Sequence, residues 1–314
     1  MHYPTTAAAC AALSAIIAFA APPRANATFS IAACEAASGR CGVAVATNNL
    51  AVGHGAPFAE AGVGAGISQF ETNPCQAPAA LSALRRGDST LDALGAALVA
   101  SPACADGYTD ADRQTSVVAP AGRGAAHTGG NASAYAGQRV GTAVAVAGNE
   151  LTGPEVLEAM WVSYHGSEGE PLAERLLAAL EAGHAAGGQR TGVLSAALLV
   201  ATPEGWPVDI DLRADFAPGE AIAHVRTAYD ANRARTLLFR ASQLSDDTQA
   251  RRLVENALDL APRWDRLWLT AARLAHARGW EALAARCACH FEALNPAWAA
   301  SLEDAEGVAN CPDG

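Results

Sequence analysis

The chain has 314 residues, of which 51% are hydrophobic and 17% are charged, so it is neither a short scaffold held only by disulfides nor a globally disordered chain. Its 21 basic residues are all Arg and face 32 acidic residues, for a net charge of −11. No nucleic-acid partner is expected from this balance, and the lack of Lys excludes a Schiff base or a lysine general base.

Residues 1–27 have the features of a secretory signal peptide. The apolar stretch Ala7–Ala21 is too short to anchor in a bilayer, and Ala25-Asn-Ala27 is a small-x-small cleavage site. A cut after Ala20 satisfies the same rule but leaves Pro22 close behind the bond, so the later cut is favoured. An apolar first helix is the alternative. We therefore expect a periplasmic or secreted protein with no membrane span once the signal is removed.

Cleavage after Ala27 makes Thr28 the first residue of the exported chain. Its hydroxyl then lies a few atoms from a free α-amine, whose ordinary pKa of about 7.7 to 8 suits a general base. Alternating residues predict strands over 28–34 and 41–47, with a turn sequence between them. In this hairpin Cys34 lies opposite Cys41, and Thr28 lies opposite Thr47.

The rest of the first two thirds of the chain alternates between strand and helix patterns. Further strands are predicted at 62–69, 114–119, 124–128, 142–147, 194–201 and 207–212, and helices at 79–86 and 90–100, from Pro154, and from Pro171 to Gly187. This order is that of an α+β protein. It favours a sheet sandwich covered by helices over a doubly wound sheet.

Ordered motifs over residues 28–228 resemble the family called domain of unknown function 1028. They include Thr28-Phe-Ser-Ile-Ala-Ala, Gly42-Val-Ala-Val-Ala, Ala51-Val-Gly53, Ala61-Gly-Val-Gly-Ala65, Gln69 with Thr72-Asn-Pro74, Val146-Ala-Gly-Asn149, Gly153-Pro-Glu-Val156, Ser195-Ala-Ala-Leu-Leu-Val200 and Asp211-Leu-Arg213. That family is similar in fold to the N-terminal nucleophile hydrolases, which implies a four-layer αββα sandwich and a catalytic Thr28. Many members carry Ser-Lys where this chain has Thr47-Asn48, so activation here would rest on the α-amine, the Thr47 hydroxyl or an Arg.

Polar residues near predicted strand ends are the other candidates for the site. Amide hydrolysis needs a donor for the tetrahedral oxyanion, and Asn149 is our candidate; a turn-forming Asn is the alternative. Gln69 and Asn73 are expected to bind a substrate amide or the Thr28 amine, unless they only cap a helix start. Asp211 and Arg213 share one strand face, so carboxylate recognition competes with a structural ion pair.

Seven cysteines remain when Cys10 leaves with the signal. In an oxidising compartment we pair Cys34 with Cys41, Cys75 with Cys104, and Cys311 with Cys287 or Cys289, which leaves one thiol free. The alternative is small buried cysteines that never pair. Cys287-x-Cys289-His290 resembles a metal motif, but residues two apart on a helix do not face each other, so neither a metal nor a cofactor is expected.

Residues 229–314 are rich in Ala, Leu and Arg and show no strand pattern. Leu260-Ala-Pro262 and Trp264 recur as Leu294-Asn-Pro296 and Trp298 with a spacing of 34 residues, the tetratricopeptide period. The predicted helices cover 237–251, 252–260, 266–278 and 282–294. One or two such repeats bury little surface alone, so this part is expected to dock on the preceding domain, pair with a second copy of the chain or bind a protein partner.

These features together predict an exported hydrolase that acts on a small amide or peptide, such as an acylated amino compound or a cell-wall fragment. Thr28 is the predicted nucleophile, its α-amine the base, and Asn149 the oxyanion donor. The alternative is a non-catalytic binding or scaffold protein on the same fold that uses residues 229–314 for partner contact.

Overall fold

The structure is a computed structural model that describes residues 27–104, 106–132, 135–205, 208–301 and 311. The predicted signal peptide over residues 1–27, apart from its last residue, lies outside these ranges. Within them, no helix is both long and apolar enough to cross a membrane.

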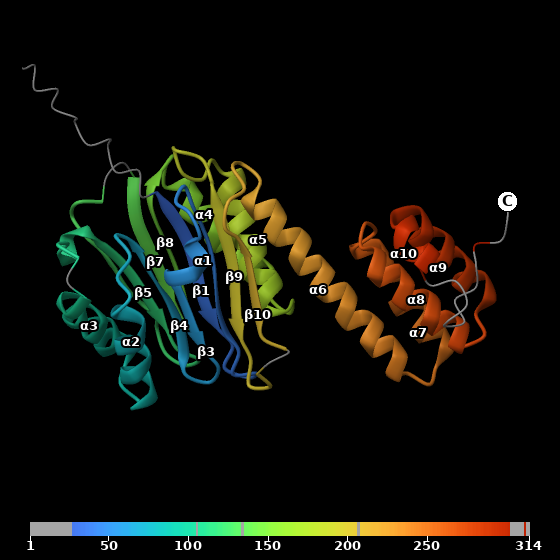
Figure 1. Cartoon of the computed structure of the whole chain (residues 1–314). Coiled ribbons are helices and arrows are strands. Elements are labelled where there is room, and N and C mark those ends of the chain that lie inside the picture. The colour runs from blue at the N-terminus through green and yellow to red at the C-terminus, as the bar shows by residue number, and fades with distance from the viewer. Residues whose placement is uncertain (1–26, 105, 133–134, 206–207, 302–310, 312–314) are drawn as a thin grey trace, which may run out of the picture.

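Strands and helices alternate through residue 214, and the elements described after it are all helices (Figure 1). The strands are β1 (Thr28–Cys34), β2 (Cys41–Thr47), β3 (Pro57–Glu60), β4 (Gly64–Phe70), β5 (Arg113–Val118), β6 (Ala125–Thr128), β7 (Tyr135–Gly141), β8 (Val144–Leu151), β9 (Ser195–Ala201) and β10 (Ile210–Ala214). The helices are α1 (Val52–Gly55), α2 (Gln76–Arg85), α3 (Thr90–Ala100), α4 (Glu155–Gly166), α5 (Leu172–Ala185), α6 (Ala221–Gln243), α7 (Asp247–Leu260), α8 (Asp265–Ala277), α9 (Glu281–Leu294) and α10 (Pro296–Ser301), with short 3-10 turns η1 (Ser101–Cys104) and η2 (Asp110–Asp112). The predicted α+β class with a C-terminal helical region is confirmed.

The strands form two antiparallel sheets. One sheet has the order β10-β9-β2-β1-β8-β7, and the other has the order β3-β4-β5-β6. The register of β1 and β2 pairs Thr28 with Thr47 and Cys34 with Cys41, as predicted for the hairpin. Strand β1 therefore lies near the centre of the larger sheet, between β2 and β8.

Alternation along β1 sends its side chains to two different cores. Phe29 and Ile31 belong to the core between the larger sheet and the helices α4, α5 and the first half of α6. Ala32 and Cys34 belong to a second core between the two sheets, which also holds Ile67 of β4. Helices α2 and α3 cover the outer face of the smaller sheet, so each sheet has helices on one face and the other sheet on the other (Figure 1).

The C-terminal helices have a hydrophobic core of their own. It runs from Ala234 and Leu238 in the second half of α6 to Phe291 in α9. The short motif that recurs with a spacing of 34 residues lies at the C-terminal ends of α7 and α9. The last helical residues there are Leu260 and Leu294. The repeated motif thus marks equivalent helix ends.

The predicted helix over 237–251 is wrong. One helix, α6, continues from Ala221 to Gln243, and the non-helical residues 244–246 separate it from α7. The Asp246 side chain caps α7 by accepting a hydrogen bond from the Gln249 N–H, which explains the new start. The predicted domain boundary at 228/229 lies inside α6.

Three disulfides are formed in the structure. The Cα atoms are 4.1 Å apart in Cys34–Cys41, 5.8 Å in Cys75–Cys104 and 4.5 Å in Cys289–Cys311. The first two pairs are those predicted, and the structure selects Cys289 as the partner of Cys311. Among the described cysteines Cys287 is free; it is buried, and burial raises the pKa of its thiol to about 11.

Candidate active site

Thr28 begins β1 between two polar residues of the neighbouring strands. The register pairs it with Thr47 on β2 and with Asn149 on β8, and all three side chains are buried. Residues directly opposite in an antiparallel sheet share a face, with Cβ atoms about 4.5 to 5.5 Å apart. The three side chains therefore lie in one row on the face toward the smaller sheet.

The Thr28 hydroxyl contacts the Thr47 hydroxyl, with 3.0 Å between the two Oγ1 atoms. Thr47 donates its own proton to the carbonyl of Ala27 at 2.6 Å. Because that proton is used, the Thr28 hydroxyl must be the donor in the Thr28–Thr47 bond. The lone pairs of Thr28 Oγ1 consequently accept no hydrogen bond from Thr47.

A cleft of about 280 Å³ opens beside Thr28 and Thr47. Its other walls come from the loop after β2, from α1 and from the end of β4, and are formed by Asn49, Leu50, Ala51, Val52, His54, Gly55, Ala56, Gln69, Phe70 and Thr72. Ser195 of β9 holds the loop in place: its Oγ donates to the Asn49 carbonyl at 2.6 Å and accepts from the Val52 N–H at 3.1 Å. Ser195 pairs with Thr47 in the sheet, so three adjacent strands build this end of the cleft.

Backbone strain is concentrated around the cleft. The described non-glycine residues with positive φ are Ala51, Phe70, Ala143 and Glu150. Ala51 and Phe70 line the cleft, and Glu150 directly follows Asn149. A left-handed non-glycine residue costs about 1 to 3 kcal/mol and persists where the surrounding structure enforces it, often at functional sites. Three of the four strained positions therefore line the cleft or lie next to Asn149.

The Asn149 side chain on the larger sheet is hydrogen-bonded to a buried glutamine of the smaller sheet. Gln114 of β5 accepts hydrogen bonds through Oε1 from Asn149 Nδ2 at 2.9 Å and from Gln69 Nε2 at 2.6 Å. Ser30 completes the chain by donating to Gln69 Oε1 at 2.7 Å. Gln114 also donates to the Gly148 carbonyl at 2.9 Å, next to Asn149. Gln114, Ser30 and Ser195 were not predicted as site residues, because they are polar residues at ordinary strand positions.

Asn149 retains unused hydrogen-bonding capacity. Its side chain is fully buried, and its Oδ1 has no hydrogen-bond partner among the described residues. Its amide group donates one bond, to Gln114, and has a second N–H hydrogen. Asn149 itself is not part of the cleft lining, since Thr28 lies between it and Thr47 in the sheet.

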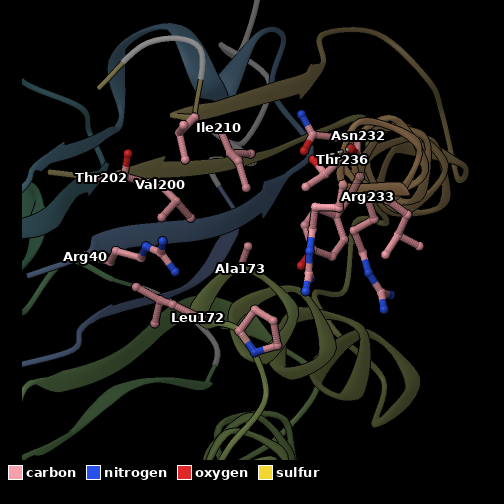
Figure 2. A pocket seen from close by; sticks show the side chains of 14 residues that line it. Arg40, Leu172, Ala173, Val200, Thr202, Ile210, Asn232, Arg233 and Thr236 are labelled. Atoms are coloured by element: carbon pink, nitrogen blue, oxygen red, sulfur yellow. Dashed lines mark hydrogen bonds between the residues drawn. The ribbon is translucent and has the colours of Figure 1, made fainter. Parts of the chain in front are cut away.

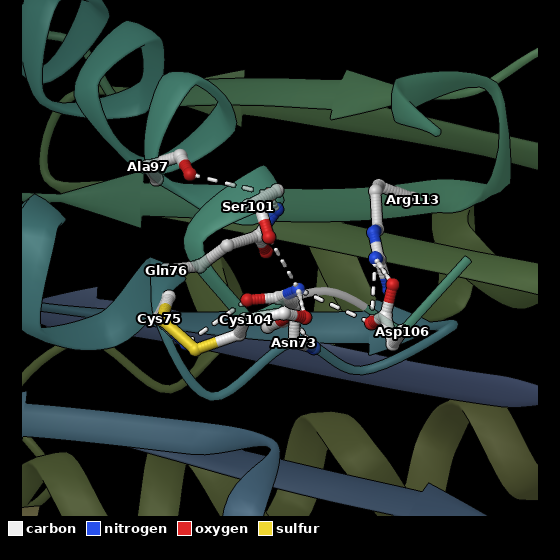
Figure 3. The surroundings of a disulfide bond; sticks show 9 residues. Asn73, Cys75, Gln76, Ala97, Ser101, Cys104, Asp106 and Arg113 are labelled. Carbon is white, nitrogen blue, oxygen red and sulfur yellow. Dashed lines mark hydrogen bonds and ion pairs between the residues drawn. A yellow bond between two sulfur atoms is a disulfide. The ribbon is translucent and has the colours of Figure 1, made fainter. Parts of the chain in front are cut away.

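Of the two predicted binding residues Gln69 and Asn73, Gln69 lines the cleft and Asn73 does not. Gln69 lines the cleft, but both ends of its amide are bound to Ser30 and Gln114. Asn73 lies away from the lining, beside the Cys75–Cys104 disulfide (Figure 3). Its Nδ2 donates to the Ser101 carbonyl at 3.1 Å and to Asp106 Oδ2 at 3.2 Å, and its Oδ1 accepts from the Cys75 N–H at 2.9 Å. The contacts of Asn73 are those of a structural residue that fixes the loop after β4.

Asp211 and Arg213 on β10 form an ion pair with 3.8 Å between Arg213 Nε and Asp211 Oδ1. The aliphatic part of Arg213 packs against Gly53 of α1, where an added Cβ would lie 2.5 Å from Arg213 Cδ. Arg213 therefore packs behind the wall of the cleft, and its guanidinium lies within ion-pair distance of Asp211. This matches the ion-pair alternative for these two residues.

His54 is the ionisable side chain of the cleft among its described lining residues. It lies on α1 between two glycines, which keep the backbone free of side chains on either side of it. The lining otherwise consists of uncharged polar and apolar groups, and no group of three or more His, Cys, Asp or Glu side chains in the described part of the chain is arranged to hold a metal ion. Cys289 of the metal-like motif is bonded to Cys311. The cleft thus suits a neutral polar ligand near Thr28.

Comparisons with known proteins place the first two thirds of the chain in a family. A search among curated proteins found no match. A crystal structure of a Silicibacter pomeroyi protein that bears the same family name, DUF1028, is 30% identical, covers 65% of this chain and 84% of its own, and superposes with a TM-score of 0.57. The family model described as a family of unknown function, DUF1028, matches residues 28–224, beginning at Thr28. The chain therefore belongs to the DUF1028 family.

Proposed function

We propose that the protein is an exported amidohydrolase of the N-terminal nucleophile type, with Thr28 as its nucleophile. The proposal depends on one observation: Thr28 is the first residue of a central strand and lies at the wall of a cleft, with its hydroxyl 3.0 Å from that of Thr47 and with Asn149 opposite. The family match also begins at this residue.

The contacts of the Ala27 carbonyl support the proposal that the uncleaved chain already aligns the groups around the future α-amine of Thr28. The Ala27 carbonyl accepts hydrogen bonds from the Thr47 hydroxyl at 2.6 Å and from the Asn48 N–H at 3.3 Å. Removal of residues 1–27 would take away this acceptor and free both donors next to the new α-amine. The unpartnered Oδ1 of Asn149 would be available to accept from that amine. The amine would thus be oriented by groups that the precursor already aligns.

In the proposed reaction, Thr28 Oγ1 attacks the carbonyl carbon of an amide while its proton passes to the α-amine. The tetrahedral oxyanion accepts from the second N–H of Asn149, which requires that removal of residues 1–27 open the buried Asn149 side chain to the cleft. The C–N bond then breaks, and the ammonium returns the proton to the leaving amine, which leaves an ester on Thr28. Water attacks this ester with the α-amine again as base, which releases a carboxylic acid and restores Thr28.

The wider interpretation follows from the same assignment. Two sheets face to face with helices outside fit the four-layer sandwich of N-terminal nucleophile hydrolases. Disulfides persist in oxidising compartments, which fits export to the periplasm or the medium. We interpret residues 229–314 as a tetratricopeptide-like unit that contacts a partner or a second copy of the chain, and the substrate as a small amide or peptide such as a cell-wall fragment.

A binding protein on the same fold is the second candidate. It is favoured by the absence of Lys from the sequence and by the small exposure of Thr28, whose residue surface is only 4% accessible. In that case the cleft would hold a ligand without reacting, and residues 229–314 would provide the partner contact.

The experiment uses the exported chain, the mass of its N-terminus and an electrophilic lactone or activated amide probe. Parent protein should begin at Thr28 and become labelled there. Thr28→Ala should abolish labelling with a change in unfolding free energy of at most about 0.5 kcal/mol, and Thr28→Ser should keep part of it. One extra residue before Thr28 should be nearly as damaging, because it turns the base into an amide.

Thr72→Ala is a matched control, since Thr72 lines the same cleft but lies outside the row of Thr28, Thr47 and Asn149. It should be labelled like the parent. Equal labelling of the parent and Thr28→Ala, or an exported chain that begins at Ala21, would refute the catalytic assignment.

A further inference from the structure

A second cavity, of about 330 Å³, lies at the other end of the larger sheet (Figure 2). The catalytic candidates Thr28 and Thr47 pair at one end of β1 and β2, and Cys41 pairs with Ala201 of β9 at the other. Six residue steps along a strand span about 20 Å. The cavity lined by Val200 and Arg40 is therefore separate from the cleft at Thr28.

The floor and walls of this second cavity are largely apolar. They are formed by Pro171, Leu172, Ala173, Val200, Val208, Ile210 and Leu237. These residues come from the start of α5, from β9, from the start of β10 and the residues just before it, and from the second half of α6. Such a lining removes apolar ligand surface from water, at about 25 cal/mol for each Å² buried.

The polar groups of the same cavity are mainly hydrogen-bond donors. Arg40 enters from the turn between β1 and β2, and Arg233 and Asn232 enter from α6 on the facing side (Figure 2). Arg240 lies about two turns further along α6. The described lining contains no carboxylate, although the whole chain carries a net charge of −11.

The carboxylates nearby do not saturate these arginines. Glu204 lies 3.5 Å from Arg40 Nη2, and both side chains are substantially exposed. Glu174 and Asp230 lie 3.3 and 3.8 Å from Arg233. Within the described ranges Arg240 has no ion pair, which leaves its charge free for a ligand.

The Arg40 guanidinium is also incompletely hydrogen-bonded. Its Nε is buried and has no hydrogen-bond partner among the described residues. A buried N–H without an acceptor costs about 1 to 3 kcal/mol, so such a group is normally satisfied by something. Because this Nε is closed to solvent, an anion in the cavity could reach it only after the Arg40 side chain shifts, so the observation shows incomplete pairing of Arg40 and not a preformed contact.

We propose that this cavity binds an amphipathic anion, with its acyl-sized apolar body between Leu172, Val200 and Ile210 and its head group held by Arg40 and Arg240. Guanidinium forks match the planar or tetrahedral oxygens of a carboxylate or phosphate ester, and the volume falls in the range of small-molecule sites. This ligand is independent of the reaction proposed at Thr28.

The test uses isothermal titration calorimetry on the exported chain with octanoate and octyl phosphate. Octan-1-ol and acetate are the matched probes that lack the charge or the apolar body. At least one of the two octyl anions should bind saturably, and whichever binds more tightly identifies the head group. Octan-1-ol and acetate should each bind at least about tenfold more weakly.

Arg40→Met and Arg240→Met should each weaken binding of the octyl anion at least about tenfold. Arg235→Met, an exposed residue of α6 outside the lining, is the control and should bind like the parent. Thr28→Ala should also bind like the parent, which separates this site from the proposed reaction. No saturable binding of either octyl anion, equally tight octan-1-ol, or undiminished binding in Arg40→Met and Arg240→Met with parental circular dichroism would overturn the proposal.

Discussion

Replacement of Gln114 by Met should test how much the buried network beneath the site stabilises the fold. Met has nearly the same length and flexibility as Gln but neither donates nor accepts a normal hydrogen bond. Gln114 Oε1 is the acceptor for Gln69 Nε2 at 2.6 Å and for Asn149 Nδ2 at 2.9 Å, and all three residues are buried. Two buried donors therefore lose their partner.

Each orphaned donor costs about 1 to 3 kcal/mol, so Gln114→Met should lower the free energy of unfolding by about 2 to 6 kcal/mol. Urea denaturation followed by far-ultraviolet circular dichroism measures the change, with an unaltered denaturant slope as the sign that the unfolded state is the same. The control is Gln138→Met on β7, where the side chain is exposed and accepts from Thr128; it should change stability by less than about 0.5 kcal/mol. A loss below about 1 kcal/mol in Gln114→Met would refute the reasoning.

Three further outcomes are expected. Replacement of both Cys34 and Cys41 by Ser should lower stability by about 2 to 3 kcal/mol, because the bond closes a short loop of separation 7, and an unchanged urea midpoint would contradict this. A hydrogen bond from Arg113 lowers the pKa of Asp106, so the ionised carboxylate stabilises the fold above the unfolded pKa of about 4, and this stabilisation is lost as pH falls through the folded value. Between about pH 5 and pH 2 the parent should therefore lose more stability than Asp106→Asn. Equal slopes of stability against pH in the two proteins would exclude the pairing. Burial raises the pKa of the Cys287 thiol to about 11, so in the exported chain this thiol should not react with a thiol reagent at pH 8 until denaturant is added. Rapid labelling of the native protein would show that the thiol is accessible.

The hairpin that carries Thr28 was predictable because three signals agree there. Residues 28–34 and 41–47 alternate, a turn sequence separates them, and cysteines stand at matching ends. Strands β3 and β7 lacked such signals. Pro57 begins a four-residue strand at a sheet edge. Strand β7 is also an edge strand, with glycines at its third and last positions and with residues that are exposed or half-buried. Edge strands bury too little to impose a clear period.

The candidate site was predictable only in its backbone register. The pairing of Thr28 with Thr47 follows from the hairpin, whereas Asn149 was expected beyond a strand and instead lies within β8, paired with Thr28. The role of Gln114 depends on β5 facing β8 across the two sheets, a long-range contact that no local pattern encodes. The prediction that Asn73 binds a substrate could not take into account Ser101 and Asp106, whose oxygens accept hydrogen bonds from its amide. The end of α6 was a missed local signal, since Asp246 followed three residues later by Gln249 is typical of a helix start.

Helix α6 makes the two cores mechanically dependent on each other. Its 23 residues correspond to a rod about 35 Å long, whose first half is packed against the larger sheet and whose second half belongs to the core of the C-terminal helices. Such a rod acts as a lever: a tilt of about 10° at its base carries its far end about 6 Å, by the geometry of its length. A chain cut at 228/229 would end after only eight residues of α6, too few to hold a helix unaided, so separate expression of the two parts requires that one of them keep the whole rod.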